Sequence, residues 1–477
     1  MNREMPVRNP RTGLDDYVIH PLTESGVAEL AAKLRQAQES WFSSGLTHRC
    51  EVLKAWADTL LADSAGVVDA LAIDTGRYLV SVVEVQSLAS IVARWCEIAP
   101  DLLSDSGERP SATEGVDVRN QFVPYGLVGV ISPWNFPFLL SMLDSIPALI
   151  AGCAVLVKPS EVTPRFIEPL QRSLAATPEL DGVFKWIAGD GKTGAAIIEN
   201  VDAIAFTGSV ATGRIVAEAC ARNFIPSFLE LGGKDPAIIL PSAETTQAAR
   251  IVLRASVQAT GQACQSLERI YVHRDQYEAF VDTLVFMAEK VDLNYPEIHS
   301  GHIGPLIFGK QAEIISDHLE DAVAKGATIR CGGRIETHGG GKWIRPTVVT
   351  GVDHSMKLMT EETFGPVIPI MAYDSVDEAV ALANDTKYGL SAAVIGADIE
   401  EADAVGRRIN AGAVSINDGG LTTEVFDAQH DSFRFSGMGA ARMGPSGITR
   451  FMRRKALLIR HEGAKGIESV NEGLMRA

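Results

Sequence analysis

The segment Leu127-Val128-Gly129-Val130-Ile131 is followed, after Ser132, by the turn Pro133-Trp134-Asn135-Phe136-Pro137 and an apolar stretch to residue 150. A short apolar run before a turn predicts a buried strand, and the longer apolar stretch after it predicts a helix. The same alternation recurs, with strands expected at 154–157, 203–206 and 237–240 and helices at 137–150, 165–174 and 213–220. This alternation predicts an α/β fold, in which a parallel sheet carries helices on both faces.

The segments on either side of this region complete the predicted architecture. Residues 26–100 carry apolar side chains at helical spacing and are expected to be mostly helical. A second series begins near Gly232, with helices expected at 251–257, 277–291 and 310–325 and strands at 367–372, 392–395 and 413–416. This series predicts a second α/β domain, in which the glycines at 339–341 mark a hairpin or loop.

Length, charge and cysteine pattern limit the classes of function. A chain of 477 residues is expected to form two or three domains. Its formal net charge of −17 disfavours nucleic acids and anionic membrane surfaces as main partners. Its six cysteines are scattered without a Cys-x-x-Cys pair, which disfavours a metal site or a disulfide framework and favours a reducing compartment.

Targeting segments are not expected either. Residues 1–13 contain four charged side chains and no apolar core, so no signal peptide is predicted. No uninterrupted apolar run reaches the length of a membrane span. The expected localisation is therefore cytoplasmic.

Cys264 and Glu230 are the candidate catalytic pair. Cys264 ends the stretch Gly261-Gln262-Ala263-Cys264, and Glu230 begins Glu230-Leu231-Gly232-Gly233-Lys234. A thiol is a nucleophile that can hold an acyl group as a thioester, and a carboxylate can activate the water that releases it. Taken singly, each has an ordinary interpretation, since cysteine is often a small core residue and glutamate a solvated charge. Glycines beside both residues allow tight turns or close approach of a ligand, which favours the catalytic interpretation.

Three segments are candidates for dinucleotide contacts. Phe206-Thr207-Gly208-Ser209 lies between an expected strand and an expected helix, so Ser209 either caps the helix or helps to hold a phosphate at its N-terminus. Lys158-Pro159-Ser160-Glu161 follows another strand, where Glu161 either accepts both hydroxyls of a ribose or lies in a surface loop. The stretch 189–194 fits G-x-G-x-x-G literally but lacks a following acidic residue at the expected distance, which favours an ordinary loop.

Asn135 lies in a turn that two prolines make rigid. Its side-chain amide is a candidate donor to a developing oxyanion, and the alternative is that it bonds only to backbone. The segment Glu362-Thr363-Phe364-Gly365-Pro366 precedes an expected strand and is uninformative by itself.

Taken together and in this order, the motifs resemble those of the aldehyde dehydrogenase superfamily. The resemblance rests on six segments: 133–137, 158–161, 206–209, 230–234, 261–264 and 362–366. It implies a Rossmann-like cofactor domain, an α/β catalytic domain and a small β oligomerisation arm, in a homodimer or homotetramer. The implied domains are residues 1–114 and 128–231 for NAD binding, 232–432 for catalysis, and 115–127 with 449–461 for the arm.

The resemblance also implies a role for each candidate residue. Cys264 would attack a small-molecule aldehyde to give a thiohemiacetal, and Asn135 with the Cys264 N–H would stabilise the oxyanion. Hydride would pass to NAD, and Glu230 would activate water to hydrolyse the thioester. Cofactor contacts are implied for Trp134, Lys158, Glu161, Ser209, Glu362 and Phe364, and no metal is implied. Because Glu161 would repel a 2′-phosphate, NAD is expected in preference to NADP.

The chain departs from familiar members of the superfamily on the substrate side. Ala440-Ala441-Arg442 stands where many members have Arg-Glu, Gln265 and Ser266 follow the nucleophile, and the loop at 418–435 is dissimilar. These departures leave the catalytic residues intact and the substrate open.

Leu140, Leu143 and residues 423–426 are expected to line a pocket that prefers an uncharged or aromatic aldehyde to succinate semialdehyde, unless the leucines are ordinary core residues. If succinate semialdehyde is preferred instead, Arg434 or Arg442 would anchor the carboxylate of this substrate.

Two alternative functions remain at this point. One is a CoA-acylating aldehyde dehydrogenase, a branch that typically lacks the base corresponding to Glu230. The other is a non-catalytic member kept for a structural or binding role, which the intact Cys264, Asn135 and Glu230 disfavour.

Overall fold

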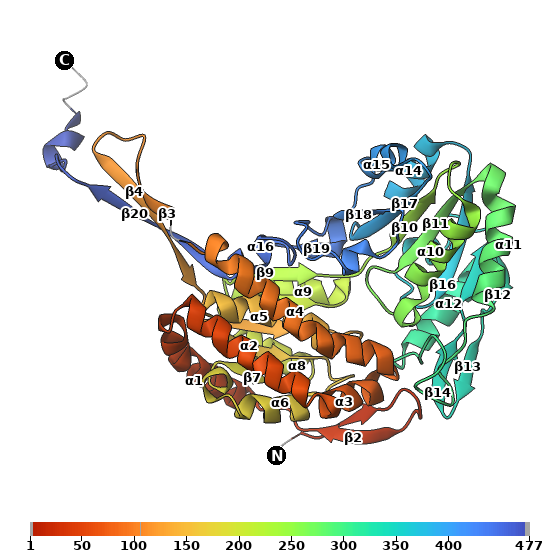
Figure 1. The fold of residues 1–477 in the computed structure, drawn as a ribbon, viewed down its shortest axis with the longest axis horizontal. Helices are drawn as coiled ribbons and strands as arrows, with labels where there is room; N and C mark the ends of the chain where they lie inside the picture. The colour runs from red at the N-terminus through yellow and green to blue at the C-terminus, as the bar shows by residue number, and fades with distance from the viewer. Residues whose placement is uncertain (1–2, 105, 473–477) are drawn as a thin grey trace.

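The computed structural model describes residues 3–104 and 106–472. Two sheets made mainly of parallel strands form two neighbouring bodies, and a narrow three-stranded sheet extends away from them (Figure 1). The predicted α/β class is therefore confirmed.

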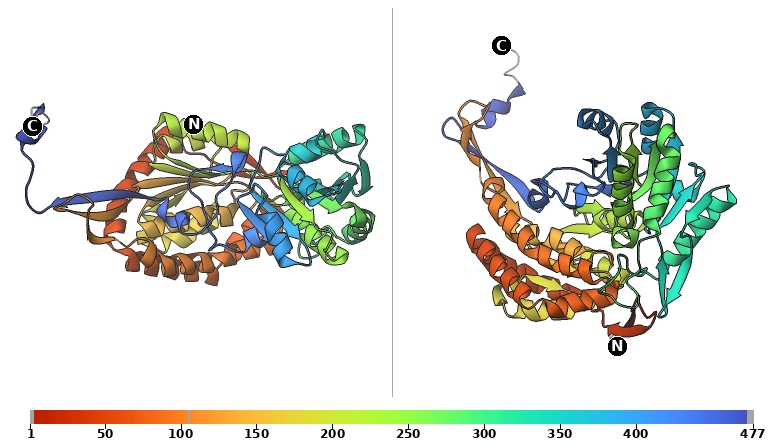
Figure 2. Two further views of the ribbon diagram at one scale, coloured as in Figure 1. Left: turned by 90° about the horizontal axis from the view of Figure 1, so that it is seen from above. Right: turned by 45° about the vertical axis from the view of Figure 1, so that its right-hand side comes forward.

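The first sheet has six strands in the order β19-β9-β8-β5-β6-β7. Its strands are β5 (Leu127–Ile131), β6 (Ala154–Lys158), β7 (Phe184–Trp186), β8 (Ala203–Thr207), β9 (Ser227–Glu230) and β19 (Gly437–Met438). All are parallel except β19, which runs antiparallel to β9. Every residue of β5, β6 and β8 is buried, because helices cover both faces of the sheet (Figure 2).

The helices of the first body confirm the prediction that residues 26–100 are mostly helical. They are α1 (Glu24–Ser43), α2 (Leu46–Ala62), α3 (Ala65–Thr75), α4 (Tyr78–Leu102), α5 (Pro137–Ala151), α6 (Ile167–Ala175), α7 (Pro178–Asp181), α8 (Gly191–Ile198) and α9 (Val210–Arg222). One prediction is wrong: the G-x-G-x-x-G stretch is not an ordinary loop but opens α8. Asp190 caps this helix by accepting from the backbone N–H groups of Lys192 and Thr193.

The second sheet has seven strands in the order β12-β15-β16-β11-β10-β17-β18. They are β10 (Asp235–Ile239), β11 (Leu267–His273), β12 (Thr328–Cys331), β15 (Thr347–Thr350), β16 (Val367–Tyr373), β17 (Ser391–Ile395) and β18 (Ala413–Ile416). Alternate residues of β10 face two separate hydrophobic cores, Ala237 and Ile239 on one side and Ile238 on the other. The sheet is therefore covered on both faces, as predicted.

Helices and hairpins surround this second sheet. The main helices are α10 (Thr245–Val257), α11 (Tyr277–Ala288), α12 (Gln311–Ala324), α14 (Val376–Asn384) and α15 (Ile399–Gly406). The predicted hairpin at the glycine run is present, between β13 (Ile335–His338) and β14 (Gly341–Ile344), and Gly339 and Gly340 turn it with φ of 59° and 96°. A second hairpin, β1 (Met5–Arg8) and β2 (Asp15–Ile19), is formed at the start of the described chain.

The projecting sheet consists of β3 (Ser106–Pro110), β4 (Val116–Pro124) and β20 (Met452–Arg460). β4 and β20 pair antiparallel over their whole length. β3 pairs with the other side of β4 and lies outside the range of 115–127 expected for the arm, whereas Leu127 belongs to β5 in the first sheet. Figures 1 and 2 show that this sheet extends away from the body of the protein and that no helix packs over it along most of its length.

Among the described residues, α4 is the one helix long and apolar enough by composition to suit a membrane span. Within its most apolar window, 44% of the residues are buried inside the protein. α4 packs against α2, α3 and α5, as a core helix does. Its apolar character is therefore weak evidence for a membrane segment.

Candidate active site

The loop that carries Cys264 has an unusual backbone. It follows α10, and Ala259, Thr260 and Gly261 all have positive φ, of 54°, 63° and 64°. This conformation is strained for alanine and more so for a β-branched threonine, so tertiary contacts must hold it. Thr260 supplies such contacts, because its Oγ1 donates to the Gly304 carbonyl at 3.1 Å and accepts from the Gly304 N–H at 3.0 Å.

Gly261 and Gln262 fix the rest of this loop. A Cβ atom on Gly261 would lie 2.4 Å from the backbone of Gly365, so glycine meets both the positive φ and the close approach. The Gln262 side chain is fully buried. It donates to the Pro305 carbonyl at 3.1 Å and accepts from the Ile307 N–H at 2.9 Å. Cys264 therefore sits on a rigid support.

Asn135 lies against the same loop. It is buried, and its Nδ2 donates to the carbonyl oxygen of Gln262 at 3.0 Å. Its own carbonyl accepts from the Arg77 guanidinium, which also donates to the Ala259 carbonyl at 3.2 Å. The amide group carries a second N–H, which the bond to Gln262 does not use. Asn135 thus bonds to backbone and keeps a second donor beside the loop that carries Cys264.

Glu230 ends β9, where it pairs with Thr207 on β8 and with Gly437 on β19. Its side chain is half-buried, and its Oε2 accepts from the Ser432 hydroxyl at 2.7 Å. Ser432 lies in the loop at 418–435, and no sequence pattern indicated that it would contact Glu230.

The environment of Cys264 keeps its side chain protonated. Burial raises the pKa of this thiol to about 12, the carboxylates of Glu362, Asp235 and Glu230 act in the same direction, and the Arg442 guanidinium opposes them. At neutral pH the cofactor-free protein therefore carries a thiol and not a thiolate. Attack on a carbonyl carbon then needs a proton acceptor or an added positive charge at the site.

Lys158 and Glu161 follow β6 as expected. Lys158 is buried, and its Nζ donates to the carbonyl oxygens of Pro159 at 3.0 Å and Gly189 at 2.9 Å. Burial lowers the pKa of Lys158, and Glu161, whose Oε2 is 3.5 Å from Nζ, opposes this effect. The side chain of Glu161 remains 41% exposed, so its carboxylate is accessible to a ligand.

Ser209 caps α9, because its Oγ accepts from the Thr212 N–H at 3.2 Å. The helix-cap interpretation is confirmed, and a role in phosphate binding stays a prediction. The two interpretations are compatible, since the cap satisfies one of the four N–H groups that lack a partner within the first turn of a helix. The dipole of this 13-residue helix also favours an anion at that end.

Glu362 and two aromatic side chains bring distant motifs together. Glu362 Oε1 accepts from the Gly233 N–H at 3.1 Å. Burial raises the pKa of Glu362 to about 8, and the neighbouring carboxylate of Glu268 acts in the same direction. The rings of Trp134 and Phe364 meet edge to face with centroids 5.3 Å apart. The segments 133–137, 230–234 and 362–366 therefore form one wall of the site.

Glu268 organises this wall and was not predicted. It lies on β11, where its carboxylate accepts from the N–H groups of Thr363 at 2.8 Å and Phe364 at 2.7 Å and from Lys234 Nζ at 2.6 Å. These bonds hold the loop in which Phe364 has a φ of 53°. Two adjacent charged residues, Glu268 and Arg269, within a short run of apolar residues were the available signal, since buried charges are almost always paired.

The side chains of these motifs fit a dinucleotide. Glu161 and Glu362 are carboxylates suited to ribose hydroxyls, and the N-terminus of α9 suits a phosphate. The edge-to-face pair of Trp134 and Phe364 provides an apolar surface near Glu362.

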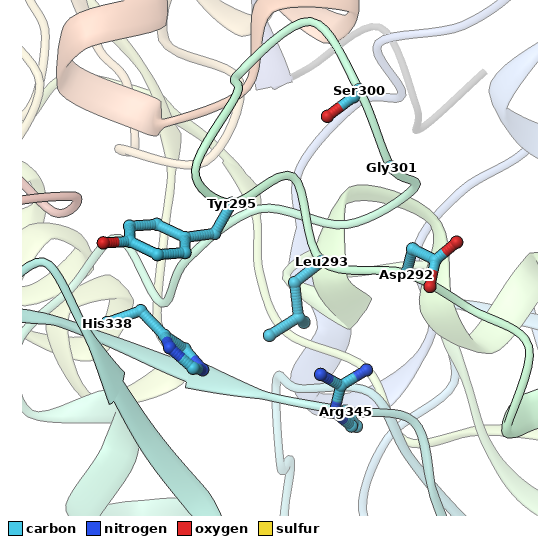
Figure 3. Close-up of a pocket in the computed structure, with 7 residues that line it drawn as sticks. All are labelled: Asp292, Leu293, Tyr295, Ser300, Gly301, His338 and Arg345. Carbon is cyan, nitrogen blue, oxygen red and sulfur yellow. The ribbon is translucent and has the colours of Figure 1, made fainter.

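A separate cavity of about 360 Å³ lies away from all of these residues (Figure 3). It is lined by Asp292, Leu293, Tyr295, Ser300, Gly301, His338 and Arg345. Two of its cationic or basic groups already share one carboxylate, since Glu336 lies 2.7 Å from His338 Nε2 and 3.0 Å from Arg345 Nε. None of the predicted site residues contributes to it.

Comparison with known proteins decides the family. The sequence model of the Aldehyde dehydrogenase family matches residues 1–457. The chain belongs to this family. Like other aldehyde dehydrogenases, it is an enzyme that oxidises an aldehyde to the carboxylic acid with NAD or NADP.

Individual aldehyde dehydrogenases show the extent of the similarity. A Mycolicibacterium smegmatis protein, provisionally named a succinate-semialdehyde dehydrogenase that uses NADP, is 36% identical over 94% of this chain and 87% of its own length. The 4,4′-diapolycopene aldehyde oxidase of a Methylomonas species is 34% identical over 82% of this chain and 74% of its own.

Solved structures of aldehyde dehydrogenases have the same fold. PutA from Anabaena variabilis, provisionally described as an aldehyde dehydrogenase, is 49% identical, with a TM-score of 0.95 over 98% of this chain and 99% of its own. Lactaldehyde dehydrogenase from Escherichia coli is 27% identical, with a TM-score of 0.91 over 96% of each chain.

Proposed function

We propose that this aldehyde dehydrogenase oxidises an uncharged aldehyde with NAD, using Cys264 as the nucleophile and Glu230 as the base that activates water. The hydrogen bond of 3.0 Å from Asn135 to the Gln262 carbonyl carries the proposal, because it places a side-chain amide beside the loop of Cys264. An amide beside a thiol is the arrangement that acyl chemistry requires at a developing oxyanion.

In the first half-reaction, Cys264 Sγ bonds to the carbonyl carbon and loses its proton. The nearby carboxyl groups of Glu362 and Asp235, whose charges act on Cys264, are the candidate acceptors of this proton, and Glu230 is reserved for water. The second N–H of the Asn135 amide and the Cys264 N–H donate to the oxyanion, and removal of one such donor typically costs on the order of a hundredfold in rate. When bound, NAD would supply the acceptor for the hydride that leaves the thiohemiacetal carbon, and a thioester would remain on Cys264.

In the second half-reaction, Glu230 takes a proton from water as the water oxygen bonds to the thioester carbon. The carbon–sulfur bond then breaks, the proton held by Glu230 passes to the sulfur atom, and the acid and the Cys264 thiol are released. Oε2 of Glu230 already accepts a hydrogen bond from Ser432, so we assign Oε1 as the oxygen that accepts the proton from water. The same carboxylate is the reason to favour water over CoA as the acyl acceptor.

A panel of aldehydes tested with NAD or NADP, with and without CoA, checks this proposal. We expect reduced cofactor and free acid, with no acyl-CoA when CoA is added. Formation of acyl-CoA would favour the CoA-acylating alternative. Absence of turnover with every aldehyde would favour the non-catalytic one.

Cofactor preference is the first specific prediction. The partly exposed Glu161 carboxylate would lie close to a 2′-phosphate, and like charges in contact repel. We expect kcat/KM to be about tenfold or more higher with NAD than with NADP. Glu161→Gln should narrow this difference by raising kcat/KM with NADP. A higher kcat/KM with NADP, in line with the name of the M. smegmatis relative, would contradict the prediction.

Substrate preference is the second specific prediction. Both arginines considered as carboxylate anchors are already engaged: Arg434 donates to the carbonyls of Asn384 and Thr386, and Arg442 is paired with Asp144. Leu140 is half-buried and able to line a pocket, whereas Leu143 lies in the core. We expect a higher kcat/KM for benzaldehyde than for succinate semialdehyde, and the reverse order would refute this pocket assignment.

Assembly into an oligomer is the third specific prediction. The sheet of β3, β4 and β20 projects from the body, and Leu458 on β20 is 71% exposed. An extended sheet with open edges and exposed apolar residues is suited to pairing with another copy. We propose a homodimer or homotetramer formed through this arm. Light scattering should give two or four times the chain mass of 51.1 kDa, and Leu458→Asp should lower it. A monomer mass at every concentration would exclude the proposal.

A further inference from the structure

A buried cluster of charged side chains contacts β8 at Thr207, and the catalytic steps above do not use it. Asp144 on α5 accepts from Arg442 Nε at 3.0 Å and from Arg442 Nη2 at 2.8 Å. Arg450 also donates to Asp144, and all three side chains are buried. Two guanidinium groups therefore share one carboxylate. The cluster carries one positive charge in excess, which is costly unless another negative group lies close.

Strand pairing brings Glu230 next to this cluster. Thr207 on β8 is paired with Glu230 on β9, and neighbouring strands lie about 4.8 Å apart, with paired side chains on the same face. The Arg442 guanidinium donates to the Thr207 hydroxyl, which places it on that face. On the other side of Glu230 lies Gly437 of β19, from which the chain continues to Arg442.

The electrostatics agree with this placement. Burial alone would lower the pKa of Arg442, but Asp144 and then Glu230 raise it, and the net shift is upward. Glu230 also acts on Arg450 in the same direction. The carboxylate of Glu230 is therefore a second negative charge that acts on both guanidinium groups.

We propose that Arg442 and Ser432 are positioning residues for Glu230, the first through its excess positive charge and the second through its hydrogen bond. Ser432 holds Oε2 at 2.7 Å, while Arg442 attracts the carboxylate toward the Thr207 side of the sheet. Together they fix the orientation in which Oε1 faces the thioester. This inference rests on the proposed role of Glu230 in deacylation. In this inference Arg442 positions Glu230 and does not bind the substrate.

Rapid-mixing kinetics of Arg442→Gln separate the two half-reactions. The burst of reduced cofactor reports acylation and hydride transfer, and the steady state reports deacylation. We expect the burst to persist and the steady-state rate to fall about tenfold or more, because an interaction with a charged group is lost. Arg442→Lys keeps the charge and should restore most of the rate. Arg408→Gln, at an exposed arginine paired with Asp377, serves as the matched control and should leave both phases unchanged.

Ser432→Ala tests the other support and does not remove a buried charge, so it remains informative if Arg442→Gln fails to fold. We expect it to slow the steady state several-fold with the burst intact. In a Glu230→Gln background, neither substitution should have much further effect, because both act through that carboxylate.

The proposal is overturned if Arg442→Gln slows both phases equally, if Ser432→Ala leaves the steady state unchanged, or if either effect persists in full beside Glu230→Gln. An unchanged steady state in Glu230→Gln alone would instead refute the proposed function of Glu230.

Discussion

Replacement of Cys264 by alanine is expected to abolish aldehyde oxidation while leaving NAD binding intact. Loss of a covalent nucleophile typically lowers turnover by about ten-thousandfold or more. The substitution removes only the sulfur atom, so the backbone contacts that hold the loop, made by Thr260 and Gln262, remain. Steady-state absorbance of NADH measures the loss, and quenching of protein fluorescence by NAD measures the retained binding.

Cys331 offers a matched control for this experiment. It lies half-buried on β12, where its Sγ contacts the carbonyl of Pro346, remote from the predicted site. Cys331→Ala should keep near-normal turnover. Substantial activity in Cys264→Ala, or an equal loss in the control, would rule out Cys264 as the nucleophile.

Glu230→Gln is expected to slow release of the acid far more than formation of the thioester. General-base catalysis contributes about a hundredfold to ten-thousandfold, and glutamine keeps the shape of the side chain without its basicity. One equivalent of NADH should form rapidly, followed by a slow steady state, when NAD and enzyme are mixed with aldehyde in a stopped-flow instrument.

The amplitude of that burst discriminates between two roles of Glu230. Burial raises the pKa of Cys264 to about 12, so the thiol needs a proton acceptor before it attacks. A retained burst means that another group supplies this acceptor and that Glu230 acts on water. Loss of the burst would contradict the assigned role and show that Glu230 activates the thiol.

The strands at the centre of each sheet could be predicted because they are buried on both faces. β5, β6 and β8 are continuous apolar runs, and their residues are all buried. β11 was missed because Glu268 and Arg269 interrupt its apolar run, although both are buried and hydrogen-bonded. β9 was missed because four residues ending in a charge give little periodic signal.

The candidate site divides in the same way. Residues in recognisable motifs, such as Asn135, Glu362 and Phe364, could be named in advance, and the structure brings their segments together. Ser432 and Arg442 lie more than two hundred residues from Glu230 in sequence, and only the pairing of β19 with β9 brings them near it. Local patterns carry no information on such contacts.

We propose above that the acyl group passes through a thioester on Cys264 and is released by Glu230. The most direct test is mass spectrometry of Glu230→Gln, quenched in acid after mixing with NAD and the best aldehyde of the panel. We expect one acyl group per chain, located on the peptide that contains Cys264 and removed by hydroxylamine. NADH formation without an adduct, or an adduct on another residue, would contradict it.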